Sequence, residues 1–274
     1  MESFVLSNGV TIPAVGFGTW KAAETDGVAV LSEAIRAGYR HIDTASFYGT
    51  EESVGKAVAQ SGVARGELFI TTKAWKTEMG YDNILRAFDK SCQMMGLDYV
   101  DLYLIHWPLP APDCADWKAL DRDSWKAMER IYEQGGAKAI GVSNFLVHHL
   151  ENLLAGCNIA PMADQVEFHP GYTQWDTVEF AQKHGIQMEA WSPLGRQRLA
   201  QEPLLNQLAE KYGVSLAQLC LKFALQCNVI PLPKSANPER MRQNLALDFT
   251  INDEDMERIH AMPQAGWSGQ HPDR

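Results

Sequence analysis

The sequence predicts a (β/α)8 barrel, with a β-hairpin before it and extra helices after it. Eight short apolar runs recur along the 274 residues at intervals of 24 to 42 residues, the length of one strand–helix unit. Segments with the periodicity of amphipathic helices lie between these runs. No linker-like, low-complexity or charge-run segment divides the chain, so we expect a single domain over residues 1–274.

The first predicted element is a two-stranded hairpin. Residues 4–6 and 10–12 flank Asn8-Gly9, a dipeptide that favours a tight two-residue turn. The eight barrel strands come next along the chain. They are expected to begin near residues 15 (VGFGT), 41 (HID), 69 (FITTK), 100 (VDLYLIH), 139 (AIGVS), 163 (ADQVE), 187 (QMEAW) and 229 (VIPLP).

The intervening segments have the spacing of helices with one apolar face. Val28, Leu31 and Ile35 follow an i, i+3, i+7 pattern, and residues 216–223 repeat it. Gly38 stands where such a helix would need a residue with positive φ to end it, and Gly185 has the same position later. Two further helices, over Pro238–Leu245 and Asp253–Met262, are expected to close the fold.

A doubly wound sheet is the alternative for a chain that alternates strands and helices. Its dinucleotide-binding G-x-G-x-x-G pattern is absent, because Gly16-Phe17-Gly18 is followed by Thr19-Trp20-Lys21. The barrel has one local conflict: Pro231 lies inside the eighth strand, where a closed sheet has no edge to accommodate it. We therefore expect that strand to be short or bent.

Charge and composition exclude several classes of protein. With 24 basic and 34 acidic residues, the net charge of −10 disfavours nucleic acid and anionic membranes as partners. No apolar run is long enough for a membrane span, and the first residues do not resemble a signal peptide. Five cysteines without C-x-x-C spacing favour reduced thiols. These features predict a soluble, cytoplasmic protein.

Polar side chains collect where the predicted strands end. Because the carboxyl ends of barrel strands meet on one face, and neighbouring strands lie about 5 Å apart, these residues are expected to form one cluster. Taken singly, each has an ordinary structural explanation, such as a helix cap, a solvated charge or a core histidine. They are Asp43, Lys73, His106, Ser143, Asn144, Gln165, Trp191, Ser192, Lys234 and Ser235.

Three segments resemble the signatures of the aldo-keto reductases. Residues 38–55 (GYRHIDTASFYGTEESVG) are similar to the first signature, residues 95–108 (MGLDYVDLYLIHWP) to the second and residues 233–244 (PKSANPERMRQN) to the third. The stretches GVSNF, QVEFHP and WSPLG also match, so the resemblance covers nearly the whole chain in order. The short segment over residues 110–123 and the tail ending SGQHPDR look most like those of the compact bacterial 2,5-diketo-D-gluconate reductases.

The resemblance implies reduction of aldehydes and ketones, with Tyr48 as the acid, Lys73 as the modulator of its pKa, Asp43 as the partner of Lys73, and His106 orienting the carbonyl. Residue chemistry agrees, because an ammonium about 4 Å from a phenol supplies on the order of 4 kcal/mol. That energy would lower the pKa of Tyr48 by the roughly 2–3 units that an acid working near neutrality needs.

The resemblance also implies NADPH as the hydride donor, since no side chain supplies a hydride. Lys234 and Arg240 suit a 2′-phosphate, and barrel phosphate sites often follow the last two strands. No metal is expected. The implied cofactor contacts are Ser143, Asn144 and Gln165 for the carboxamide, Trp191 for the ring, Ser192, Leu194 and Gly195 near the pyrophosphate, Lys234, Ser235 and Arg240 for the 2′-phosphate, and Gln243 and Asn244 for the adenine.

Aromatic residues next to the strand ends suggest a wall for a small carbonyl substrate. These are Trp20, Phe47, Trp75 and Trp107, each of which is also explained by core packing. The resemblance implies a monomer. One departure from the family pattern is Asp164, where Asn usually precedes Gln165.

Two other functions are compatible with a barrel. A metal-dependent hydrolase would need several His and Asp ligands at strand ends, but His41 opens a strand, His148-His149 begin a helix, and only His106 is well placed. A cofactor sensor without activity is disfavoured by the intact set of Asp43, Tyr48, Lys73 and His106.

Overall fold

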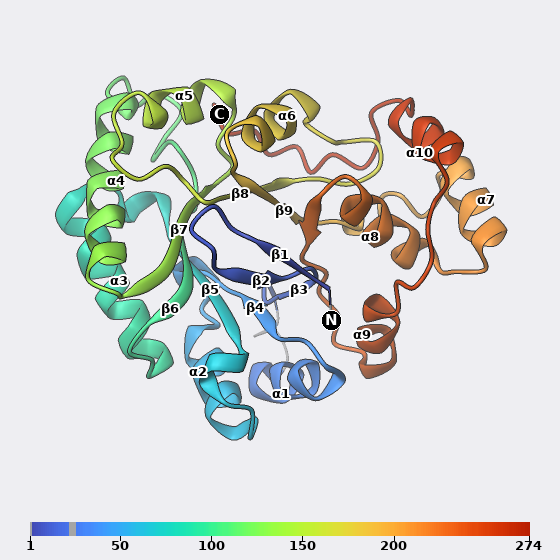
Figure 1. Ribbon diagram of the computed structural model, residues 1–274, viewed down its shortest axis with the longest axis horizontal. Helices are drawn as coiled ribbons and strands as arrows, with labels where there is room; N and C mark the ends of the chain where they lie inside the picture. Colours follow the sequence, from blue (N-terminus) through green and yellow to red (C-terminus); the bar gives the residue numbers. More distant parts are fainter. Residues whose placement is uncertain (1, 22–25) are drawn as a thin grey trace.

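A computed structural model describes residues 2–21 and 26–274, and it contains the predicted barrel. Eight parallel strands form one sheet whose spatial order follows the chain, and helices surround them (Figure 1). The strands are β3 (Gly16–Gly18), β4 (His41–Asp43), β5 (Phe69–Ala74), β6 (Val100–Ile105), β7 (Ala137–Ser143), β8 (Ala163–Glu167), β9 (Gln187–Trp191) and β10 (Val229–Pro231).

The helices occupy the segments between these strands. The two extra helices are also present, one with the expected bounds and the other ending two residues earlier than expected. The helices are α1 (Gly27–Ala37), α2 (Glu51–Gln60), α3 (Tyr81–Met95), α4 (Trp117–Glu133), α5 (Val147–Leu154), α6 (Trp175–Lys183), α7 (Pro203–Tyr212), α8 (Leu216–Gln226), α9 (Pro238–Leu245) and α10 (Asp253–His260). None within the described ranges has the length and apolar character that crossing a bilayer requires.

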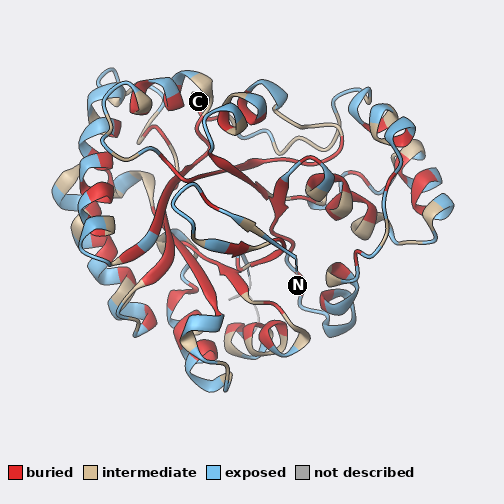
Figure 2. Cartoon of the chain, viewed as in Figure 1, coloured by how far each residue is buried: buried red, intermediate tan, exposed pale blue. Residues whose placement is uncertain are grey.

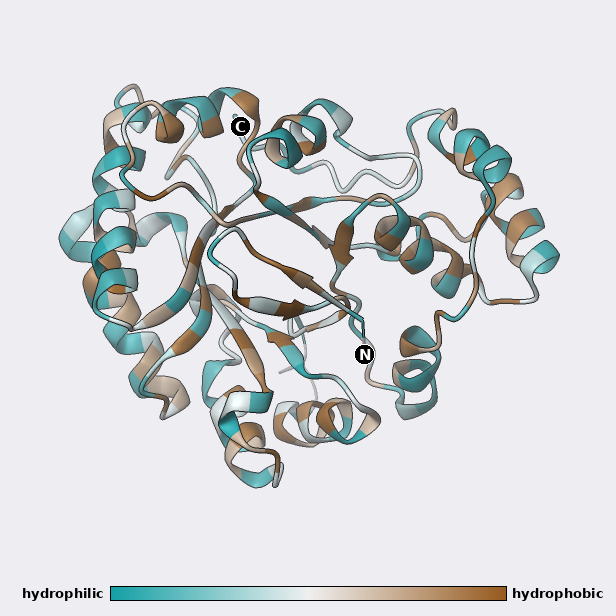
Figure 3. Ribbon diagram, viewed as in Figure 1, coloured by the Kyte–Doolittle hydropathy of each residue, from teal (hydrophilic) through white to brown (hydrophobic). Residues whose placement is uncertain are grey.

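Burial explains why these residues form strands and helices. All six residues of β5 and of β6 are buried, as expected for strands covered on both faces. The surrounding helices carry buried residues toward the strands, and most of them expose their opposite face to solvent (Figure 2). The apolar residues follow the same division, with brown strands inside mostly teal helical faces (Figure 3).

The predicted hairpin, β1 (Ser3–Val5) and β2 (Thr11–Pro13), lies across the ring of strands (Figure 1). Its pairing is shifted by about one residue from the expected segments. The Asn8 amide at its turn donates to the carbonyl oxygen of Lys138, 2.9 Å away at the start of β7. The hairpin therefore covers the end of the barrel at which the strands begin, and leaves the opposite end to the loops.

The barrel closes between its first and last strands without a regular ladder. The Gly18 N–H donates to the Pro233 carbonyl at 3.0 Å, just beyond β10. Glycine favours this approach, because a Cβ on Gly18 would lie 3.1 Å from the backbone carbonyl oxygen of Leu232. The Leu232 N–H bonds to β9, so by alternation the ring nitrogen of Pro231 faces the unladdered seam. The expectation of a short eighth strand is confirmed, and the seam accommodates its proline.

A charged cluster stabilises the end of the barrel that the hairpin covers. Asp101, near the start of β6, is almost fully buried and forms ion pairs with Arg65 at 2.7 Å and Lys138 at 2.9 Å. It also accepts the Ile70 N–H at 2.9 Å. A buried carboxylate with these partners joins β5, β6 and β7, so removing its charge leaves cations without compensation.

We expect Asp101→Asn to lower the free energy of unfolding by about 1–3 kcal/mol, because the pair is buried on the Asp side and partly exposed on the cation side. Urea denaturation followed by circular dichroism measures this loss. Glu52→Gln, which breaks a surface pair with Lys56, is the matched control and should leave the urea midpoint unchanged. Equal effects of the two substitutions would contradict a structural role for this cluster.

Candidate active site

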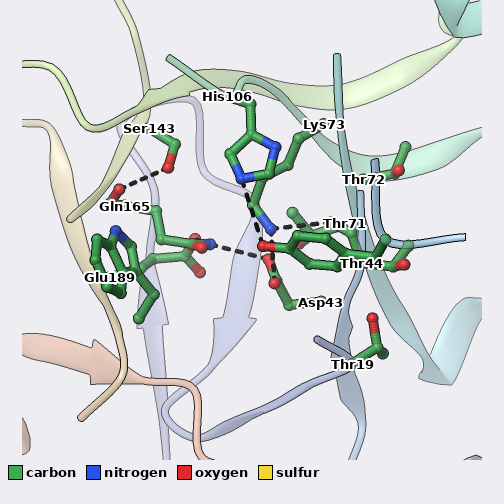
Figure 4. Close-up of polar contacts among 12 residues, drawn as sticks. Thr19, Asp43, Thr44, Thr71, Thr72, Lys73, His106, Ser143, Gln165 and Glu189 are labelled. Carbon is green, nitrogen blue, oxygen red and sulfur yellow. Dashed lines mark hydrogen bonds and ion pairs between the residues drawn. The ribbon is translucent and has the colours of Figure 1, made fainter. Parts of the chain in front are cut away.

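A buried ion pair lies at the end of the barrel where the strands terminate. Lys73, on β5, has no exposed surface, and its ammonium donates to Asp43 Oδ1 at 2.7 Å and to the Thr44 carbonyl at 2.9 Å (Figure 4). Burial is the largest single effect and lowers the pKa of Lys73, but the charge of Asp43, its hydrogen bond to Lys73 and contributions from neighbouring acidic groups together outweigh burial, so the pKa is raised. Lys73 is therefore a cation at neutral pH, held in place by β4.

Tyr48 and His106 complete the predicted group of four. Tyr48 ends a short 3-10 turn, Ser46–Tyr48, and its hydroxyl lies 3.4 Å from His106 Nε2. The Lys73 ammonium lies 5.2 Å from the centre of the Tyr48 ring. His106 follows β6, and its backbone N–H bonds to the carbonyl of Ala74 at 3.0 Å. Residues from three neighbouring strand ends thus bring a phenol, an ammonium and an imidazole together.

The electrostatic expectation for Tyr48 is wrong in its net direction. Burial raises the pKa of Tyr48, and this effect exceeds the lowering by Lys73, so the pKa is above its ordinary value of 10. The expectation considered the ammonium and left out the loss of solvation of a phenolate. As a result Tyr48 holds its proton throughout the physiological range, which is the state that a proton donor requires.

His106 is neutral in the same surroundings. Burial lowers its pKa well below 6.5, and the Lys73 ammonium lowers it further. Its Nδ1 is buried and makes no hydrogen bond with the residues that the structure describes. A neutral imidazole next to a protonated phenol provides hydrogen-bond donation without a second strong acid.

A chain of hydrogen bonds follows the ends of the next strands. Ser143 Oγ donates to the Gln165 carbonyl at 2.7 Å, and the Trp191 indole donates to Asn144 Oδ1 at 2.7 Å. The Asn144 amide donates to the His106 carbonyl at 2.9 Å and to Ser143 Oγ at 3.1 Å. Asn144 has a φ of 64°, a conformation that Asn tolerates better than most residues. These four predicted contacts therefore form one connected rim beside His106.

The residues after β9 form a tight turn. Ser192 has a φ of 51°, and its hydroxyl accepts a hydrogen bond from Arg196 Nε at 3.0 Å. The Arg196 guanidinium lies 5.4 Å from the centre of the Trp191 ring. Leu194 is half-buried, and Gly195 begins a 3-10 turn, Gly195–Gln197, where a Cβ would lie 2.8 Å from Leu199. The Arg196 cation therefore lies against the Trp191 ring beside the active site.

The remaining predicted cofactor residues lie after β10 and on α9. Asn237 caps α9 by accepting the Arg240 N–H at 3.0 Å. Lys234, Arg240 and Gln243 are exposed, whereas Ser235 and Asn244 are buried. Two exposed cations next to the start of a helix favour an anion. The prediction that Asn244 contacts the adenine does not agree with its position, because it lies on the buried face of α9 near the Tyr39 hydroxyl.

Three of the four predicted wall residues form a continuous aromatic stack. The Phe47 ring lies 3.9 Å from that of Trp75 and 5.8 Å from that of Trp20, in nearly parallel planes. Trp75 meets His106 edge-on at 5.0 Å. Trp107 is half-buried and has no ring contact with the described residues. Trp20 and Phe47 are 40% and 50% exposed, so the stack presents apolar surface next to the polar group.

Glu189 belongs to this polar cluster, although it is not among the residues that the sequence predicts for the site. It lies on β9, is fully buried, and accepts a hydrogen bond from the Gln165 amide at 3.0 Å (Figure 4). Its other oxygen is 3.7 Å from His41 Nε2. The available signal was a charged residue in the middle of the strand sequence QMEAW, where an inward-facing acid needs a partner.

A group of possible metal ligands lies on α5 and the C-terminal tail. Among the described residues these are His148, His149 and Asp273, and Asp273 Oδ1 is 3.1 Å from Nε2 of each histidine. However, His149 Nδ1 accepts the Leu146 N–H at 3.1 Å, so the proton of the neutral ring is on Nε2. A histidine in this tautomer cannot offer Nε2 to a cation, and the group is better described as a clasp for the tail.

Comparison with known proteins agrees with the resemblance in the motifs. The model of the aldo/keto reductase family matches residues 14–263. Glyoxal reductase of Bacillus subtilis is 45% identical over 99% of this chain and 96% of its own, and methylglyoxal reductase DkgA of Salmonella typhimurium is 38% identical over 98% and 96%.

A solved structure extends the similarity to the fold. The crystal structure of a Bombyx mori aldo-keto reductase in complex with NADP superposes with a TM-score of 0.87 at 37% identity, over 94% of this chain and 91% of that one. The chain belongs to the aldo/keto reductase family.

Proposed function

We propose that this protein reduces the carbonyl group of small aldehydes and ketones, with NADPH as hydride donor and Tyr48 as proton donor. The observation that carries the proposal is the Tyr48 hydroxyl, held 3.4 Å from His106 and beside the buried Lys73–Asp43 pair. A protonated phenol next to a neutral imidazole suits a carbonyl oxygen that gains negative charge as the reaction proceeds.

The charge and protonation of each of the four residues determine its role in the proposed reaction. Tyr48 donates its proton to the carbonyl oxygen, and the Lys73 cation stabilises the phenolate that remains. Asp43 and the Thr44 carbonyl hold Lys73 in position. His106 donates an N–H to the carbonyl oxygen and orients it. The Lys73 ammonium also lies 5.2 Å from the centre of the Tyr48 ring, so its positive charge acts on Tyr48 as well as on Asp43.

The rim residues suit a primary carboxamide such as that of nicotinamide. Both N–H bonds of Asn144 and both of Gln165 are used within the protein. What these side chains retain are acceptor lone pairs on Asn144 Oδ1 and Gln165 Oε1, and a carboxamide has two N–H bonds to donate. When bound there, NADPH supplies the hydride, and Trp191 would stack on its ring.

The exposed cations after β10 suit the 2′-phosphate that distinguishes NADPH from NADH. Lys234 and Arg240 would pair with it and the Ser235 hydroxyl would donate to it. The exposed Gln243 would meet the adenine. Ser192, Leu194 and Gly195 would lie along the pyrophosphate, where Arg196 adds a cation.

For the substrate we propose small dicarbonyl compounds. Two relatives carry the names glyoxal reductase and methylglyoxal reductase, and the aromatic stack of Trp20, Phe47 and Trp75 offers an apolar wall next to the acid. We include 2,5-diketo-D-gluconate in this group because of the resemblance of the sequence motifs alone. A panel of glyoxal, methylglyoxal, 2,5-diketo-D-gluconate and aromatic aldehydes ranks these substrates by kcat/KM.

We also propose that the protein works as a single-domain monomer in the cytoplasm. The eight strands form one sheet, and α9 packs against α1 across its seam. All five cysteines are unpaired, as is usual in a reducing compartment. Light scattering coupled to gel filtration tests the monomer, which a mass near twice 30.5 kDa would contradict.

Tyr48→Phe is expected to lower kcat for NADPH oxidation by about 10²–10⁴-fold, since only the proton donor is lost while the ring still packs on Trp20. The loss of NADPH absorbance with methylglyoxal measures this. Tyr132→Phe, which removes a phenol near the hairpin, is the control and should retain activity. Normal turnover by a folded Tyr48→Phe protein would refute the assignment of the acid, and NADPH binding without turnover by the wild type would favour a sensor.

Arg240→Ala is expected to raise the Kd for NADPH about 10- to 100-fold and to leave the Kd for NADH nearly unchanged, because a charge-assisted contact to the 2′-phosphate is lost. Calorimetric titration measures both constants. Arg242→Ala on the same helix is the matched control, since Arg242 faces Glu33 of α1. An unchanged ratio of the two constants in Arg240→Ala would contradict this phosphate site.

A further inference from the structure

The amide of Gln165 lies between two buried carboxyl groups. Gln165 Nε2 is 2.9 Å from Asp43 Oδ2 and 3.0 Å from Glu189 Oε2 (Figure 4). Asp43 is paired with Lys73 and, as a carboxylate, only accepts hydrogen bonds. The edge of the amide that faces Asp43 must therefore be its nitrogen, and Glu189 takes the second N–H.

This arrangement determines what Gln165 can offer a ligand. With both N–H bonds used, the amide retains its carbonyl oxygen, Oε1, which forms no hydrogen bond with the described residues. If the amide turned over, the oxygen would face the Asp43 carboxylate and the nitrogen would face the ligand. The two orientations select opposite ligands, one that donates and one that accepts.

We propose that Glu189 is a positioning residue of the cofactor site, which together with Asp43 holds the Gln165 amide with Oε1 presented to the N–H donor of the nicotinamide carboxamide. This inference rests on the proposed function. Glu189 touches neither the acid nor the carbonyl, and it acts through Gln165. Glu189 is the register partner of Gln165 in the pairing of β8 with β9, so the pairing of these two strands sets the Glu189 carboxyl beside the Gln165 amide.

The ionisable groups around Glu189 explain how a carboxyl group can be fully buried at this position. The ionisable groups facing it are Asp43 and His41 on β4, Lys73 on β5 and Asp164 on β8, whereas β10 contributes Val229, Ile230 and Pro231. Burial and then Asp43 raise the pKa of Glu189 to about 8. A protonated Glu189 still accepts from Gln165 through its other lone pairs, and the interior then holds one balanced ion pair.

The decisive experiment compares two ligands that differ only at the carboxamide. NADP+ has the N–H donor, and its 3-acetylpyridine analogue has a methyl group in its place. We measure the Kd of each by calorimetry for the wild type, Glu189→Leu and Glu189→Gln. Glu189→Leu removes the acceptor, and Glu189→Gln keeps a carbonyl oxygen for Gln165.

We expect the wild type to bind NADP+ more tightly than the analogue, and Glu189→Leu to lose about 5- to 10-fold of that preference, the value of one oriented hydrogen bond. Glu189→Gln is expected to retain the preference to within twofold. The Kd of 2′-phospho-ADP-ribose, which lacks nicotinamide, should be the same in all three proteins. Equal losses for NADP+ and the analogue, or no loss, would overturn the proposal.

A second measurement separates positioning from general packing. NADP+ has a cationic ring and NADPH a neutral one, so ionisation of Glu189 should favour NADP+. In the wild type we expect the ratio of Kd for NADP+ to Kd for NADPH to fall roughly threefold as pH rises from 7 to 9, and in Glu189→Gln to stay constant. A parallel fall in both proteins would count against Glu189.

These outcomes are distinct from failure of the proposed function, which would appear as a wild type that binds no NADPH. Glu189→Leu is expected to fold, because replacing a buried carboxyl by an apolar side chain removes a desolvation cost. Circular dichroism and the urea midpoint check this for each variant.

Discussion

The ion pair between Lys73 and Asp43 is the interaction on which the rest of the site depends. An ammonium with no exposed surface is stable in a barrel interior only if a carboxylate and a carbonyl compensate it. Asp43 provides the carboxylate from β4, and Thr44 the carbonyl from the next residue. Once this pair is in place, the opposite oxygen of Asp43 is free to hold Gln165, and the cation is free to act on Tyr48.

The same burial sets the protonation of every other group around the pair. It keeps the proton on Tyr48, removes the charge of His106 and favours the neutral form of Glu189. The interior therefore contains one compensated pair of charges surrounded by neutral donors and acceptors. Such a site binds a neutral carbonyl compound without a large desolvation cost and can stabilise the charge that appears during reduction.

The residues that stabilise the barrel and the residues of the active site lie at opposite ends of the strands. At the end covered by the hairpin, Asp101 ties Arg65 and Lys138 into a cluster that stabilises the strands. An extended strand from Asp101 to His106 spans about 16 Å, which separates the Asp101 cluster from the active-site residues at the other end of the barrel. A substitution in the cluster is therefore expected to change stability without changing the chemistry, as barrels generally allow.

The sequence by itself determined the barrel class and the approximate strand positions, because the periodicity of apolar residues is a local property of the chain. The resemblance of its motifs to a known family singled out Asp43, Tyr48, Lys73 and His106. The sequence also located Pro231 as a point of conflict. Only the tertiary structure decided how the barrel closes between Gly18 and Pro233, which direction the pKa of Tyr48 takes, and that Glu189 meets Gln165. All three features depend on contacts between different strands and on the loss of water around buried groups. The spacing of residues along a single strand does not specify these contacts or this burial.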